Sequence, residues 1–133
     1  MINRIMDGQI LIAIVGDFKD VGWGNNFITE NGLPMQIGIM RKNKEYVSNH
    51  IHKVRNRQFE SISNEFHYVV RGKVIVSLFS TAKDLITKIM LGSEMFCALY
   101  NGGHGFEIIK DDTLILEIKN GSFTSKEDDK EVL

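Results

Sequence analysis

The chain has 133 residues, of which 43% are hydrophobic and 25% charged, a balance typical of a soluble globular protein with one domain. Sixteen basic and seventeen acidic residues give a net charge of -1, so the basic excess of most nucleic-acid-binding proteins is absent. Cys97 is the only cysteine, which excludes an intrachain disulfide and a zinc cluster of thiolates. The first residues lack the features of a signal peptide, and the apolar run at 10–15 is too short to cross a bilayer. We therefore expect a cytoplasmic protein that binds neither nucleic acid nor membranes.

Short segments rich in Val, Ile and Phe follow one another along the chain and are separated by turn residues, which predicts an all-β domain. The clearest pair is a hairpin of 64–70 and 73–79, because Gly72 between them can take the positive φ of a tight turn. About ten such strands at regular spacing predict a sandwich or closed barrel in a single domain over 1–123, followed by a polar tail over 124–133. Further strands are expected at 9–15, 34–40, 46–52, 85–91, 94–100, 106–109 and 113–118, with a loop over 17–26.

The four histidines are the most informative residues for function. His50 and His52 are separated by one residue, so on a strand both imidazoles would project from the same face, near enough to share one metal ion. His104 lies between glycines, in Gly103-His104-Gly105, which leaves room around its ring. Either a buried metal ligand or an ordinary hydrogen-bonded histidine fits that setting.

Glu65 begins a strand of aromatic and β-branched residues, and a carboxylate is costly to bury there unless a cation pairs with it. A metal ion would meet that need, whereas an exposed position at the strand end would remove it. His67 shares a face with Glu65 by the two-residue period of a strand. We expect His67 to be a core residue or a partner of a metal ligand rather than a ligand itself.

In their order along the chain these residues resemble the two motifs of the cupin superfamily. The first cupin motif has the form H-x-H, a short gap, E, six residues and G, and is matched by His50-Ile51-His52, Glu65 and Gly72. The second is matched by Gly92, the apolar run at 95–99, and Gly102-Gly103-His104. The similarity covers roughly 36–121, and the segment from Gly102 onwards resembles small bacterial single-domain cupins, some of which accompany surface-polysaccharide or sugar-nucleotide genes.

The resemblance implies a jelly-roll barrel, the double-stranded β-helix of cupins, whose metal is held by His50, His52, His104 and Glu65. The chain departs from the motif in the gap between His52 and Glu65, which spans twelve residues, 53–64, in place of three or four. That excursion offers Glu60 as a rival carboxylate ligand. Other candidates for pocket or supporting roles are His67, Tyr100, Gln36 and Glu60.

Three histidines and a carboxylate do not select strongly among Fe(II), Mn(II), Ni(II) and Zn(II), so the expected cofactor is one divalent transition metal. A barrel of this size suits one small molecule. We therefore expect either a mononuclear metalloenzyme acting on a small sugar-like or organic-acid substrate, or a non-catalytic cupin that binds or senses a small molecule. Cupins commonly protect their sheet edges by dimerising, so a homodimer is expected.

Overall fold

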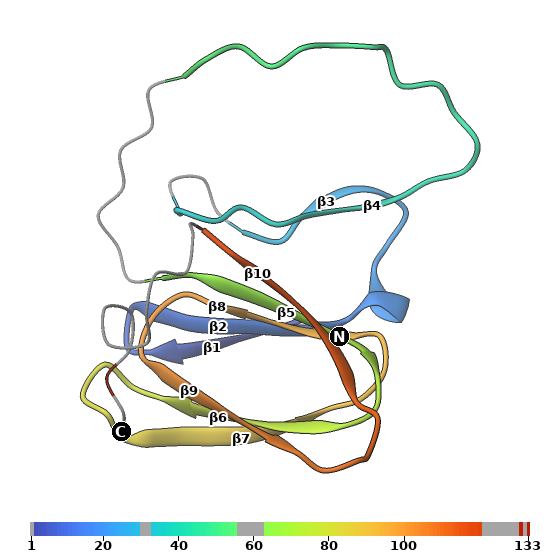
Figure 1. Cartoon of the computed structure of the whole chain (residues 1–133). Helices are drawn as coiled ribbons and strands as arrows, with labels where there is room; N and C mark the ends of the chain where they lie inside the picture. The colour runs from blue at the N-terminus through green and yellow to red at the C-terminus, as the bar shows by residue number, and fades with distance from the viewer. Residues whose placement is uncertain (1, 30–32, 56–62, 121–130, 132) are drawn as a thin grey trace. The chain divides into compact units, whose positions relative to one another are not determined.

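A computed structural model describes residues 2–29, 33–55, 63–120, 131 and 133 (Figure 1). The chain divides into two compact units. Met1–Asp20 and Ile62–Leu133 form the first, here named the sandwich unit, and Val21–Ser61 form the second unit. Most of the polar tail expected over 124–133 lies outside the described residues.

The sandwich unit consists of two antiparallel sheets that form two layers in Figure 1. Five strands lie in one sheet in the order β1-β2-β8-β5-β10, and three lie in the other in the order β7-β6-β9. A short 3-10 turn at Phe18–Asp20 follows β2. The bounds of the strands are β1 (Asn3–Asp7), β2 (Ile10–Asp17), β5 (Glu65–Arg71), β6 (Val74–Phe79), β7 (Leu85–Leu91), β8 (Met95–Leu99), β9 (Gly103–Ile108) and β10 (Leu114–Lys119).

The hydrophobic core of this unit lies where the two sheets face each other. Strand β6 shows how the sequence produces it, since Val74, Val76 and Leu78 are buried while the residues between them are less so. They contact buried residues of the five-stranded sheet, including Val69 of β5 and Leu99 of β8. Burial of one apolar face from each sheet stabilises the pair of layers.

The all-β class expected from the sequence is confirmed, and most expected strands lie within one or two residues of their positions. Within the described part of the chain the sheets have free edges, and no closed barrel is found.

Strand β1 was not expected, because its Asn-Arg-Ile-Met-Asp sequence lacks a clear alternation. The strand expected at 46–52 is wrong: these residues, all described, form no strand and are exposed. A strand requires hydrogen bonds to a neighbour, and no ladder among the described residues includes this segment.

The second unit contains a two-stranded antiparallel sheet of β3 (Gly24–Phe27) and β4 (Gly38–Arg41). Strand β3, except for Phe27, lies in the segment 17–26 that was expected to be a loop. The guanidinium of Arg41 lies 4.4 Å from the centre of the Trp23 ring, close enough for a cation–π interaction. In neither unit do the described residues form a helix long and apolar enough to cross a membrane.

The turn between β5 and β6 places a specific requirement on residue 72. Gly72 has a φ of 97°, and a Cβ atom built there would lie 2.7 Å from Cα of Thr113. Gly8, in the turn between β1 and β2, also has a positive φ, of 58°, but a Cβ there would meet nothing within 4 Å. An alanine at position 8 would therefore strain only the backbone, whereas an alanine at position 72 would also collide with Thr113.

We expect Gly72→Ala to lower the free energy of unfolding by about 2–4 kcal/mol, and Gly8→Ala by only about 1 kcal/mol. Both substitutions strain the backbone, but only alanine at 72 also displaces the chain at Thr113. Urea denaturation of the two variants beside the wild type measures the difference. Equal losses would contradict the collision at Thr113.

Candidate functional site

The polar site begins on β5, where Glu65 and His67 continue the face that carries the core residue Val69. Residues of β5 alternate between buried and half-buried from Glu65 to Val69, so these three side chains point toward the opposite sheet. Glu65 and His67 are each only 5% exposed. The inner surface of β5 therefore changes from apolar to ionisable within one strand.

Strand β10 adds two charged residues beside them. In the antiparallel register, Lys119 pairs with Glu65 and Glu117 with His67, which places their side chains on the same face of the sheet. The apolar residues that alternate with them, Leu116 and Ile118, are about half exposed. The charged face of β10 is thus turned toward the other sheet.

The three-stranded sheet contributes His104 from β9. His104 lies opposite Leu78 of β6 in the register, and Phe106 lies opposite Val76, so both belong to the inner face of that sheet. The Phe106 ring stacks on His67, with centroids 4.5 Å apart and an angle of 13° between the rings. This contact joins the two sheets and fixes the plane of the His67 imidazole.

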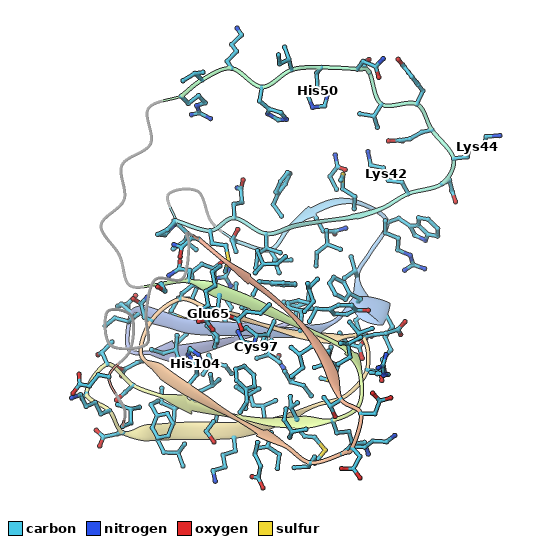
Figure 2. All side chains as sticks on the ribbon, in the orientation of Figure 1. Lys42, Lys44, His50, Glu65, Cys97 and His104 are labelled. Carbon is cyan, nitrogen blue, oxygen red and sulfur yellow. The ribbon has the colours of Figure 1, made fainter. Side chains whose placement is uncertain are left out.

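Three cationic or imidazole groups converge on the Glu65 carboxylate. Its Oε2 lies 2.7 Å from Nε2 of His67 and 3.2 Å from Nε2 of His104, and its Oε1 lies 3.1 Å from Nζ of Lys119. Glu65 and His104 approach one another from opposite layers in Figure 2. With the proton on Nε2, each imidazole donates to Oε2, and the ammonium of Lys119 donates to Oε1.

These donors hold Glu65 in its charged form. The hydrogen bond from His104, followed by that from His67, lowers the pKa of the Glu65 carboxyl well below its usual value of 4.5. Burial acts in the opposite direction, and Lys119 adds a further lowering contribution. The same interaction raises the pKa of Lys119, chiefly through its hydrogen bond to Glu65. The site is therefore a buried carboxylate compensated by three donors.

The site has donor atoms suited to a divalent metal ion. Ligand atoms of Glu65, His67 and Glu117 all lie within 4.8 Å of one another, so this group could hold such an ion. Imidazole nitrogen and carboxylate oxygen are common ligands of zinc and of other first-row transition metals. Cys97 can be set aside as a ligand, because burial raises the pKa of its thiol to about 12.

The four residues expected to bind metal are divided between the two units. Glu65 and His104 are brought together in the sandwich unit, while His50 and His52 belong to the second unit. The imidazole rings of His50 and His52 lie close to each other, with centroids 5.0 Å apart, although these residues are not on a strand. Nδ1 of His50 lies 3.0 Å from the backbone oxygen of Ser48.

The supporting residues expected from the sequence have different positions. His67 is part of the site. Tyr100 is buried just beyond β8, where its carbonyl oxygen accepts a hydrogen bond from the Asn64 side chain. Gln36 is exposed and belongs to the second unit, and Glu60 lies outside the described residues.

Sequence reasoning missed Glu117 and Lys119. The signal available was the alternation of apolar and other residues over 114–119, but that alternation does not say which face is inward. An apolar face is normally assigned to the core, and here that assignment is reversed for Leu116 and Ile118. Only the pairing of β10 with β5 places the two charged residues beside Glu65 and His67.

Comparisons of the chain with protein-family models, with curated proteins and with solved structures found no match. The chemistry of the site therefore rests on its own residues.

The lowered pKa of Glu65 predicts a specific pH dependence of stability in metal-free protein. A carboxyl group whose pKa is lower in the folded than in the unfolded chain contributes stability that is present above the unfolded value and is lost as the pH falls below it. We expect the wild type to lose this contribution below about pH 4.5, and Glu65→Gln to lack it. The free energy of unfolding of Glu65→Gln should therefore decline less between about pH 6 and pH 3.

Asp112→Asn is the matched control, because Arg71 also lowers the pKa of Asp112, but both side chains of that pair are exposed. Its unfolding curve should follow that of the wild type. Urea denaturation with a chelator present measures all three proteins. A Glu65→Gln variant that declines in parallel with the wild type would contradict the assigned role of Glu65.

Proposed function

We propose that this protein is a metal-binding cupin that holds one divalent transition metal and binds a small molecule at it. The observation that carries the proposal is the approach of His104, on one sheet, to the buried carboxylate of Glu65 on the facing sheet. Carboxylate oxygen and imidazole nitrogen are both ligands that first-row metals accept. The facing sheets are compatible with a jelly roll, which is the fold that the resemblance implies.

The resemblance to cupins implies Glu65, His104, His50 and His52 as the metal ligands, and of these Glu65 and His104 lie within one unit of the structure. The first two are supported by their distance of 3.2 Å. The second two are supported by the H-x-H motif, and also by the contact of His50 Nδ1 with a backbone oxygen. Histidines that bind metals commonly donate their second ring N–H to such a group, which leaves Nε2 for the ion. Their centroid separation of 5.0 Å is compatible with two imidazoles on one ion.

An open coordination position on such a metal would supply Lewis-acid chemistry or an activated water. The side chains around the metal would bind and orient the small molecule. Lys119 supplies a positive charge there and Glu117 a negative one. This setting suits a small polar molecule, such as a sugar-like compound or an organic acid. A cupin that binds such a molecule without turnover is the alternative, and turnover of the bound ligand separates the two.

We expect protein purified without an affinity tag or added metal to contain about one transition-metal ion per chain, because three or four such ligands suffice for a stable site. His104→Ala and His50→Ala should each lose most of that metal while the protein remains folded. Elemental analysis measures the metal, and circular dichroism checks the fold.

Glu107→Gln is the control, because Glu107 belongs to the same strand as His104 but lies on its other face. It should keep its full metal content. Absence of metal from the wild type, even after reconstitution with Fe(II), Mn(II), Ni(II) and Zn(II), would overturn the proposed function.

We also propose that the protein is a homodimer, a state that would cover the edge strand β10. Its outward residues Leu114, Leu116 and Ile118 are 43–51% exposed, and an exposed apolar edge strand favours association. Light scattering should give the mass of a dimer for the wild type. The expected mass for Leu116→Glu is that of a monomer, because a charge would be buried in the interface. A wild-type monomer across a broad range of concentrations would exclude the dimer.

A further inference from the structure

The ionisable groups around Glu65 come from both sheets of the sandwich unit. Glu65, His67 and Glu117 have ligand atoms within 4.8 Å of one another, and all three belong to the paired strands β5 and β10. His104 comes from the opposite sheet and approaches the same carboxylate from another element. The Glu65 carboxylate thus contacts groups from both sheets.

The ammonium group of Lys119 lies between the carboxylates of Glu65 and Glu117. Its Nζ is 3.1 Å from Oε1 of Glu65 and 3.3 Å from Oε1 of Glu117. A positive charge therefore already bridges the two glutamates. A metal ion bound by both of them would experience repulsion from this ammonium group, and would replace its contacts.

We propose that Glu65, His67 and Glu117 form a second metal position, separate from the one that includes His104, and that Lys119 controls its occupation. The two positions share Glu65, but the second requires none of the other ligands of the proposed cupin centre. It would take a divalent first-row ion such as Zn(II) or Mn(II), which two carboxylates and one imidazole suit.

The surroundings of the three residues are consistent with this role. Stacking on Phe106 fixes the His67 ring, while its Nε2 is directed at Glu65. The side chain of Glu117 is 45% exposed, so water can reach this end of the group and complete the coordination. Two glutamates neutralise the charge of a divalent ion, and the long, flexible side chain of Lys119 can move away when the ion enters.

The position is tested in protein from which the proposed cupin centre has been removed by His52→Ala and His104→Ala. Zinc binding to this metal-free background is measured by calorimetry, with and without Lys119→Met. The methionine is an unbranched side chain one heavy atom shorter than lysine and carries no charge, so zinc should bind about tenfold more tightly. Lys119→Arg retains the charge and is expected to leave the affinity close to that of the background.

Glu117→Gln, added to the Lys119→Met protein, decides whether the ion lies at the proposed position. Its partly exposed side chain can be changed without disturbing the core, and it should lower the zinc affinity by at least about tenfold. His67→Gln should do the same, with unfolding curves as a check on the fold. Zinc binding that is indifferent to Glu117→Gln, or no tighter with Lys119→Met than with Lys119→Arg, would overturn the second position. A wild type without bound metal would instead contradict the proposed function and leave this result standing.

Discussion

The Glu65 carboxylate is the constraint on which the polar half of the sandwich depends. A buried carboxylate is tolerated only when donors replace the water that it loses. Here the donors come from β5, β9 and β10, so one side chain links three strands and both sheets. Loss of any donor leaves the remaining charge less compensated, which makes this arrangement sensitive to single substitutions.

That requirement also explains the unusual orientation of β10. A strand has two faces, so directing Glu117 and Lys119 toward the carboxylate necessarily directs Leu116 and Ile118 outward. The space between the sheets is consequently divided along the strands. One part is the apolar core around Val69, Val76 and Leu78, and the other is the charged cluster. The apolar part stabilises the fold, whereas the charged part contains the groups on which the proposed metal binding depends.

The sequence predicted the fold class well because local patterns specify it. Alternation in β6 and the Gly72 turn are local features, and both lie where they were expected. The prediction of a strand over 46–52 was wrong because Val and Ile have strand propensity, but a strand also needs a partner. Pairing with a partner strand is not encoded in the local sequence. The resemblance to cupins implied that Glu65 and His104 belong to one site, and the two side chains lie 3.2 Å apart. Lys119 could not be found in this way, since its role arises from a register across more than fifty positions of sequence.

The burial of Cys97 makes the chain convenient for spectroscopic labelling. Its thiol is fully buried and, with a pKa of about 12, carries almost no thiolate near neutral pH. Since the chain has no other cysteine, a thiol introduced at an exposed position such as Val54 would be the one that reacts with a spin label. Distances from that label to a paramagnetic ion near Glu65 could then be measured in solution without first removing a native cysteine.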